Sequence, residues 1–223
     1  MKKSILVLLG ILFIGFVFPL SSSAEGFLPR KSTFIKHYGL GVYYSPEVIR
    51  IYDGPDEKSK LLNILAWNER GVKDSFAGSL ESENVFVAFV PTSKIALFAV
   101  EDETEDWIKV IYNQKNNQSG WVKKTQEGKF LTWRDLFNTI GRKNKVYRWS
   151  DSLSDSGILR TSPDEEAKIV SRFESKKDLN LMVIRGNWML VKVDDSDSSM
   201  PAGWIRWRTD DGKLLMFPWI VRY

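Results

Sequence analysis

The sequence predicts a mainly β fold of two related units with one short helix between them, and three observations support this prediction. Most apolar runs are short, and several alternate apolar with polar residues, as half-buried strands do. Turn-forming residues separate these runs, as in Arg185-Gly186-Asn187, and such short connections favour hairpins. A set of landmarks also occurs twice along the chain in the same order, which is the mark of an internal repeat.

The clearest predicted strands fall into two groups. Apolar segments lie at 85–91, 95–100 and 107–112, and two more lie at 179–184 and 188–193. Clusters of Gly, Pro, Asn or Asp bound these segments, so we expect each of them to form one strand.

One helix is expected over residues 132–141. Its sequence offers an N-cap, an acidic residue that can cap back, an apolar face and a glycine stop. In that order these are Thr132, then Asp135, then Leu136, Phe137 and Ile140, and finally Gly141. The basic stretch that follows lacks periodicity, so we expect residues 137–150 to be a linker.

The internal repeat defines the two units. Residues 51–62 align without a gap with residues 159–170, and both segments contain Pro-Asp-Glu. Further along each unit, a strand that begins with tryptophan precedes a Gly-Trp pair, and a turn and a short apolar strand follow. From Pro163 to Trp188 the chain advances 25 residues, but from Pro55 to Trp107 it advances 52, so the first unit carries an insertion.

The expected organisation follows from these landmarks. The insertion, near 68–89, is interpreted either as a longer hairpin or as a functional loop. The predicted segments are a signal peptide (1–24), an N-terminal extension (25–47), a first domain (48–136), a linker (137–150) and a second domain with a C-terminal strand (151–223).

The repeated landmarks resemble those of bacterial SH3-like (SH3b) domains. In that family an Arg and a Pro lie in an early loop, a Trp-x-x-Val strand follows, and a Gly-Trp-Val/Ile strand closes a small barrel. The second unit departs from the family in having Lys176-Lys177-Asp178 before its central strand, and the first departs in its insertion. The matching residues are Arg160, Pro163, Trp188, Val191, Gly203, Trp204 and Ile205 in the second unit, and Pro55, Trp107, Val110, Gly120, Trp121 and Val122 in the first.

The resemblance implies two small SH3-like β-barrels. It also implies a role, because SH3b modules commonly serve as non-catalytic targeting or recognition domains of exported bacterial proteins. Several of them bind cell-wall peptides or polymers, which makes such ligands the expected partners.

The first residues predict export. Lys2 and Lys3 precede an apolar run that ends at Leu20, and Ser22 and Ala24 suit cleavage after Ala24. An uncleaved membrane anchor is the alternative, although the run is shorter than the ~20 residues that span a bilayer. We therefore expect a periplasmic or extracellular protein that contacts the membrane only through this segment before cleavage. Since the chain has no cysteine, packing alone must stabilise it.

Charge and composition exclude several classes of function. Without residues 1–24 the chain has 30 basic and 28 acidic residues, a balance that argues against a nucleic-acid binder. The single histidine, His37, has no partner for a metal cluster, and no Gly-x-Ser-x-Gly or Gly-rich phosphate loop occurs. The acidic runs 101–106 and 194–199 could supply paired carboxylates, but solvated hairpin loops are the favoured explanation, because both runs lie between predicted strands. We expect no catalytic residues, no metal and no cofactor.

The candidate ligand-binding residues lie on the two Gly-Trp strands. Because alternate side chains of a strand point to opposite faces, Val122 and Ile205 are assigned to the cores and their neighbours to the outward face. Packing of a cation against tryptophan within the protein is the alternative explanation of this pattern. On the same reasoning Trp207 is expected to pack inward and Arg208 to share the outward face. The candidates are Trp121, Lys123, Trp204 and Arg206.

Three hypotheses of function follow. The leading one is an exported, non-enzymatic protein whose tandem modules recognise a cell-wall peptide or polymer. The second is a structural or adaptor protein that binds another exported protein, with the 68–89 insertion as the contact. The third is a glycan hydrolase that uses the acidic loops. A basic stretch from Trp121 to Arg148 could also meet an anionic surface, although a solvated linker face is the favoured explanation.

Overall fold

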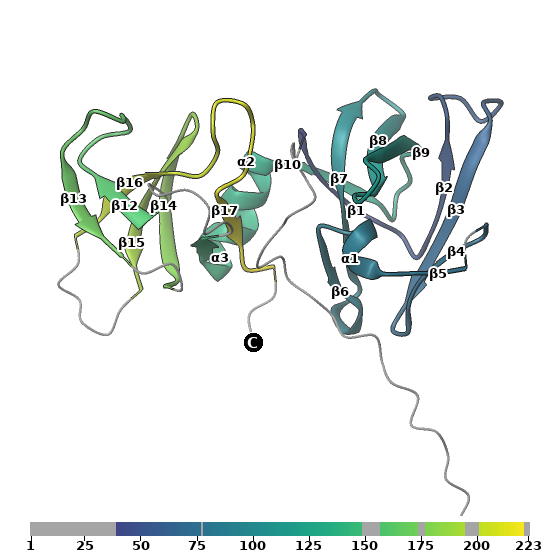
Figure 1. Ribbon diagram of the computed structural model, residues 1–223, viewed down its shortest axis with the longest axis horizontal. Helices are drawn as coiled ribbons and strands as arrows, with labels where there is room; N and C mark the ends of the chain where they lie inside the picture. Colours follow the sequence, from purple (N-terminus) through teal and green to yellow (C-terminus); the bar gives the residue numbers. More distant parts are fainter. Residues whose placement is uncertain (1–38, 77, 149–156, 174–176, 195–200, 221–223) are drawn as a thin grey trace, which may run out of the picture.

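A computed structural model describes residues 39–76, 78–148, 157–173, 177–194 and 201–220. Within them the protein is mainly β, with two antiparallel sheets and a short helical segment between them (Figure 1). The expected signal peptide, residues 25–38 of the expected extension and His37 lie outside the described residues.

The first sheet follows the order β10-β1-β7-β8-β9-β2-β3-β4-β5, and β6 pairs with β7. Its strand β1 comes from the expected N-terminal extension but lies between β7 and β10, so those residues belong to the first unit. The strands are β1 (Gly41–Tyr44), β2 (Val48–Tyr52), β3 (Leu61–Asn68), β4 (Gly71–Asp74), β5 (Gly78–Leu80), β6 (Ala88–Val90), β7 (Ile95–Glu103), β8 (Trp107–Asn113), β9 (Gln118–Lys123) and β10 (Lys129–Thr132).

The second sheet follows the order β13-β12-β16-β15-β14-β11-β17. It lies on the other side of the helical segment from the first sheet (Figure 1). Its strands are β11 (Val146–Arg148), β12 (Ile158–Arg160), β13 (Ile169–Arg172), β14 (Leu179–Arg185), β15 (Trp188–Val193), β16 (Gly203–Arg206) and β17 (Met216–Pro218).

The repeat inferred from the sequence is present in the strand pairing. Read from β17 to β13, the second sheet has the same neighbour order as the first sheet from β10 to β3. The registers also match, because Val110 lies opposite Gly120 as Val191 lies opposite Gly203. Each β7-like strand and each β2-like strand carries an irregularity at the corresponding point. The two units are therefore copies of one strand arrangement.

The closed SH3-like barrels that the resemblance implies do not form in the described strands. The pairing of each sheet has two free ends, β10 and β5 in the first and β13 and β17 in the second. In the first unit the outer edge of β3 pairs with β4, and β5 continues from there, so the insertion lengthens the sheet.

The expected helix forms with the expected N-cap. Asp135 N donates to Thr132 Oγ1 (3.1 Å), and Thr132 Oγ1 donates to the Asp135 carboxylate (2.6 Å). Gly141 as the stop is wrong, because the segment runs without a break through α2 (Trp133–Leu136), a wider turn, η2 (Phe137–Gly141), and α3 (Arg142–Asn144). It ends where Lys145 adopts a positive φ of 74°.

The stretch 137–148, expected as a linker, is built into the second unit. Phe137 is fully buried, and Val146 and Tyr147 of β11 are buried between β14 and β17. Consecutive residues can both be buried there because the Tyr147 ring packs on Trp219, 4.6 Å between ring centroids. A short strand covered on both faces has no alternation, which is why the sequence pattern concealed it.

The insertion forms regular structure. It contains β4, β5, a single helical turn α1 (Ser82–Val85) and β6. Its second half is core, since all six residues from Val85 to Val90 are buried. Phe86 stacks on Phe89 at 5.0 Å and meets Phe98 at 4.8 Å. The insertion is thus a hairpin extension followed by a buried segment.

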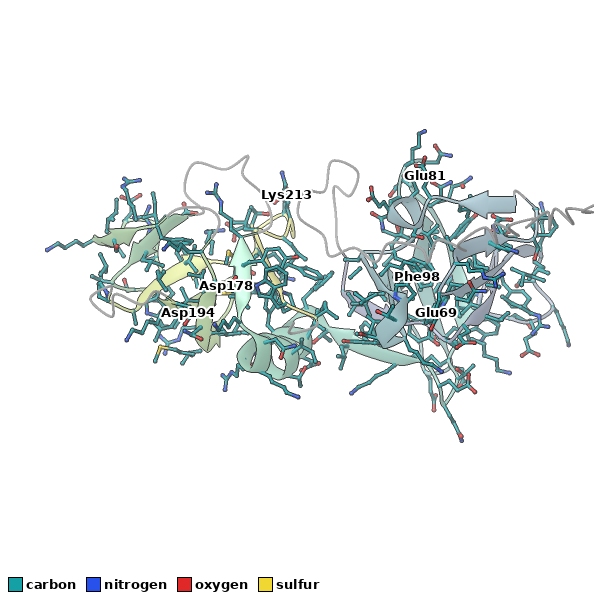
Figure 2. All side chains as sticks on the ribbon, turned by 90° about the horizontal axis from the view of Figure 1, so that it is seen from below. Glu69, Glu81, Phe98, Asp178, Asp194 and Lys213 are labelled. Carbon is teal, nitrogen blue, oxygen red and sulfur yellow. The ribbon has the colours of Figure 1, made fainter. Side chains whose placement is uncertain are left out.

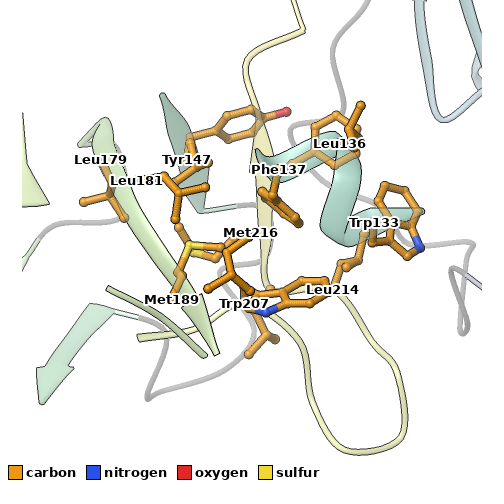
Figure 3. Close-up of a cluster of buried hydrophobic side chains, with 14 of the residues drawn as sticks. Trp133, Leu136, Phe137, Tyr147, Leu179, Leu181, Met189, Trp207, Leu214 and Met216 are labelled. Carbon is orange, nitrogen blue, oxygen red and sulfur yellow. The ribbon is translucent and has the colours of Figure 1, made fainter. Parts of the chain in front are cut away.

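The helical segment joins the cores of the two units. One hydrophobic cluster lies within the first sheet, and the other contains the second unit together with α2 and part of the first sheet, including Leu97 and Ala99. The Trp133 ring meets Phe217 at 6.0 Å. Phe137 meets Trp207 at 5.0 Å, and both rings are labelled in Figure 3. The two units therefore share apolar contacts through α2.

We predict that Gly203→Ala destabilises the protein. A Cβ at this position would lie 2.6 Å from the Leu159 Cβ, and neither atom can rotate away. Overpacking of this kind costs about 1–3 kcal/mol of unfolding free energy, which urea denaturation measures. Gly54→Ala is the matched control, because its Cβ meets only the Ser59 side chain, whose Oγ at 2.8 Å can rotate away, and it should change the unfolding free energy by less than about 1 kcal/mol. Equal losses in both variants would contradict this account.

Candidate functional site

The four candidate residues lie on the same face of equivalent strands. Val122 and Ile205, which alternate with them, are buried as expected, with 3% and 1% of their surface exposed. In cross-strand register, Lys123 lies opposite Trp107 and Arg206 opposite Trp188. Each unit therefore presents a tryptophan and a cation from its Gly-Trp strand, with a second tryptophan directly across.

The structure brings the repeated Pro-Asp-Glu turn to this face. Glu57 accepts from Lys123 Nζ at 2.7 Å, and Glu165 pairs with Arg206 at the same distance. Both turns are held by the same bonds, in which Asp53 N donates to Lys60 O and Thr161 N to Lys168 O. Sequence patterns do not predict these ion pairs, although the glutamate shared by the two repeats is a signal for them.

Arg206 is engaged by its own protein. Its guanidinium pairs with Glu165 at 2.7 Å and with Asp210 at 3.1 Å, and it lies 5.2 Å from the centroid of the Trp188 ring. Only 21% of its side chain is exposed, and its buried Nε has no hydrogen-bond partner among the described residues. Packing of a cation on tryptophan within the protein, the alternative explanation of this pattern, is therefore observed at Arg206.

The acid beside Arg206 is held in its charged form. Hydrogen bonds from Arg206 and Asn187 lower the pKa of Asp210 below its ordinary value of 3.8. Since Asn187 belongs to the turn between β14 and β15, these contacts tie the end of β16 to that hairpin.

Lys123 is more exposed than Arg206, with 54% of its side chain accessible. A hydrogen bond from Lys123 to Glu57 raises the pKa of the ammonium group. The opposite tryptophan, Trp107, meets Tyr52 edge-on at 5.6 Å. The aromatic contact that Arg206 makes in the second unit is thus replaced by Tyr52 in the first.

Trp121 and Trp204 are both half-buried, but their surroundings differ. Lys109, opposite Trp121, pairs with Glu101 at 3.2 Å. By contrast, the Arg185 guanidinium lies 5.7 Å from the centroid of the Trp204 ring, and no carboxylate of the described residues is ion-paired with it. Among the described residues, the cation beside Trp121 is therefore balanced by a carboxylate, whereas the cation beside Trp204 is not.

The prediction for Trp207 is confirmed, and the prediction for Arg208 is not. Trp207 is buried as expected, and its Nε1 donates to Gly186 O at 3.0 Å. The placement of Arg208 on the Trp204 face is wrong, because its guanidinium stacks on Trp207 at 4.8 Å and donates to Asn187 Oδ1. The reason is that β16 ends at Arg206, so the strict alternation ends there too.

In the acidic run 101–106, two glutamates are paired with lysines rather than with each other, so the described contacts show no pair of carboxylates that face one site. Glu101 pairs with Lys109 and Glu103 with Lys124, at 3.2 and 2.6 Å. Among the residues that the structure describes, no three His, Cys, Asp or Glu side chains are grouped for a metal ion.

The second acidic run lies mostly outside the described residues, except for Asp194. That carboxylate pairs with Lys145 and accepts from Asn180 Nδ2 at 3.1 Å. Nearby, Asp178 accepts from Trp219 Nε1 at 2.7 Å, and Figure 2 places both acids in the second unit. No helix in the described part of the chain is long and apolar enough to cross a bilayer.

An open hollow of about 510 Å³, which no sequence pattern indicated, lies beside the turn between β1 and β2. Trp67 lies in its wall and donates from Nε1 to Pro46 O at 2.7 Å, while Lys94 lies 3.9 Å from Glu47. Polar and apolar groups are mixed around it. The hollow is lined by Ser45, Pro46, Glu47, Val48, Trp67, Lys94 and Glu127.

Compared with family models and with curated proteins, the chain matches none of either.

We predict that Asp210→Asn reduces the pH dependence of stability in acid. Because the folded pKa of Asp210 is lowered, its contribution is present above the ordinary value of 3.8 and is lost as the pH falls through the folded value. Melting temperatures measured between neutral and acidic pH should therefore converge for wild type and Asp210→Asn at low pH. A constant difference at all pH values would contradict the assignment.

We predict that the two equivalent ion pairs differ in strength. Double-mutant cycles should give at most about 1 kcal/mol for Lys123 with Glu57, as is usual for exposed pairs. The coupling of Arg206 with Glu165 should be larger, because Arg206 is mostly covered and its position is fixed by Trp188. Equal coupling in the two cycles would show that this difference in burial has no energetic consequence.

Proposed function

We propose that this chain is an exported, non-catalytic binding protein whose two SH3b-like units recognise a cell-envelope ligand, a wall peptide or polymer. The observation that carries the proposal is the face formed by β8 and β9 and again by β15 and β16. Each copy presents a half-buried tryptophan of the Gly-Trp pair beside charged groups.

The physical basis is the chemistry of such a face. Tryptophan offers a large apolar surface at low cost in side-chain entropy, and its edge and neighbours supply polar contacts. Trp204 retains accessible surface and has Arg185 beside it. Two copies on one chain would also raise the apparent affinity for a repetitive polymer through multivalency.

The internal contacts of Arg206 change the roles within the proposed site. Because Arg206 is paired with two carboxylates, we assign it to holding the Pro-Asp-Glu turn and Trp188 in place. Trp204 and Trp121 are then the residues that contact ligand, and Lys123 has the same positioning role through Glu57.

Retention of the purified protein on peptidoglycan and envelope fractions tests the proposal. Trp204→Ala and Trp121→Ala should each weaken retention, with the larger effect at Trp204. Removing one aromatic ring that a ligand covers lowers the binding affinity tenfold or more. Circular dichroism checks that both variants fold.

Phe76→Ser is the matched control, because it removes an exposed aromatic ring elsewhere on the first unit. Failure of the protein to bind any envelope fraction, or equal loss in all three variants, would contradict the proposal.

A second candidate function, an adaptor for another exported protein, is favoured by one observation. Phe76 follows β4 in the insertion and is 70% exposed, the largest exposed fraction among the big apolar side chains of the described residues. Deleting 68–89 would remove six buried core residues, so the point variant is the better test. A co-purified partner that is lost in Phe76→Ser but kept in Trp204→Ala would support the adaptor role.

A further inference from the structure

We propose that the outer face of the second sheet binds an acidic, extended peptide segment across its strands, with the peptide carboxylate held over Trp204 by Arg160 and Arg185. This inference rests on the proposed function in that it uses the same Trp204 face, and it names the chemistry of the ligand.

The face contains a continuous row of directly paired residues. Val183 lies opposite Leu190, Leu190 opposite Trp204, Trp204 opposite Arg160, and Arg160 opposite Ile169. Residues that are directly opposite in antiparallel strands project on the same side of the sheet. The row therefore crosses β14, β15, β16, β12 and β13 on one surface.

This row is apolar and accessible at both ends. Val183 and Ile169 are 42% and 40% exposed, and the neighbouring Met182 is 49% exposed. Leu190 and Trp204 between them are half-buried. Five strands at a spacing of about 4.8 Å span about 19 Å, the length of roughly six residues of extended peptide.

Arg160, which is on this row, and Arg185, which reaches Trp204 from the neighbouring row, have no ion-paired carboxylate among the described residues. Arg160 donates to a backbone oxygen, Ala167 O, at 2.8 Å, and Arg185 lies over the Trp204 ring at 5.7 Å. The acids nearby, Glu165 and Asp210, are instead paired with Arg206. The two guanidinium groups beside Trp204 thus provide charge-assisted donors for one ligand carboxylate.

The equivalent row of the first unit lacks these properties. It reads Asp102, Lys109, Trp121, Tyr52 and Leu61, so charged residues replace the apolar pair Val183 and Leu190. Tyr52 stands in the place of Arg160, and Lys109 is already paired with Glu101. The first unit therefore serves as an internal negative control for the peptide site.

Charge favours a peptide over the other occupants. An anionic lipid surface would also approach Glu165 and Asp210, whose side chains are 63% and 77% exposed, and repulsion would result. A second copy related by twofold symmetry would have to bring Glu165 or Asp210 to these arginines, and both acids are already paired with Arg206. A peptide that carries a carboxylate between apolar side chains meets both the arginines and the apolar row.

Titration calorimetry of the purified protein with defined probes tests this inference. The probes are the capped hexapeptide Val-Ser-Glu-Ser-Val-Ser, whose valines and glutamate share one face when it is extended, the same peptide with glutamine in place of glutamate, and phosphatidylglycerol vesicles. The glutamate peptide should bind, and the glutamine peptide should bind at least about tenfold more weakly, as expected for loss of a charge-assisted contact.

The variants localise the site. Arg185→Gln should weaken binding of the glutamate peptide about tenfold without affecting the glutamine peptide. Val183→Asp, which introduces the residue of the first unit, should weaken both. Arg50→Gln, which removes one charge from an exposed position on β2, should change neither. All three positions are exposed, so the fold is retained.

The outcomes separate this inference from the proposed function. Equal affinity for the two peptides, equal loss in Arg50→Gln, or binding to the vesicles alone would overturn the inference. If Arg185→Gln keeps full envelope retention while Trp204→Ala loses it, the proposed function stands and the acidic-peptide site fails. Peptide binding that depends on Arg185 without any envelope retention supports the site and contradicts the proposed function.

Discussion

The close crossing of two strands at the Gly-Trp pair is the constraint on which each unit depends. A Cβ on Gly120 would lie 2.4 Å from Ile51 Cγ2, and one on Gly203 would lie 2.6 Å from Leu159 Cβ. Only glycine lets β2 pass β9, and β12 pass β16, at this separation. That crossing places Tyr52 opposite Trp121 and Arg160 opposite Trp204, so the same contact that builds the core also assembles the outer face.

The two units use this common frame differently. In the first, the insertion extends the sheet and adds an aromatic cluster around Phe86, and its outer face carries ion-paired residues. In the second, the outer face keeps apolar residues and arginines beside Trp204. The helical segment from Trp133 connects the two cores, because Trp133 and Leu136 pack among residues of both sheets. The same strand arrangement thus carries ion-paired residues on the outer face of the first unit and accessible arginines on that of the second.

Much of the fold could be predicted from local pattern. The mainly β class, the two-fold repeat, the helix cap at Thr132 and the inward side of Val122 and Ile205 all follow from alternation, capping and turn chemistry, which act over a few residues. The role of 137–148 could not, because burial of both faces of β11 depends on strands more than 30 residues away. Barrel closure was an expectation from family resemblance, and the open pairing of the two sheets depends on long-range contacts. Within the candidate site, alternation identified the outward tryptophans but not the carboxylates that pair with Arg206, because Glu165 comes from a distant turn and Asp210 lies beyond the end of β16, where alternation no longer applies.

The most direct test of the account is an NMR titration of the labelled protein with soluble wall peptides, followed through the indole N–H signals of its tryptophans. The account predicts that the Trp204 indole and the Arg185 side chain shift together and that Trp207, which is buried and bonded to Gly186, does not. Shifts confined to residues away from the Trp204 and Trp121 faces would contradict it.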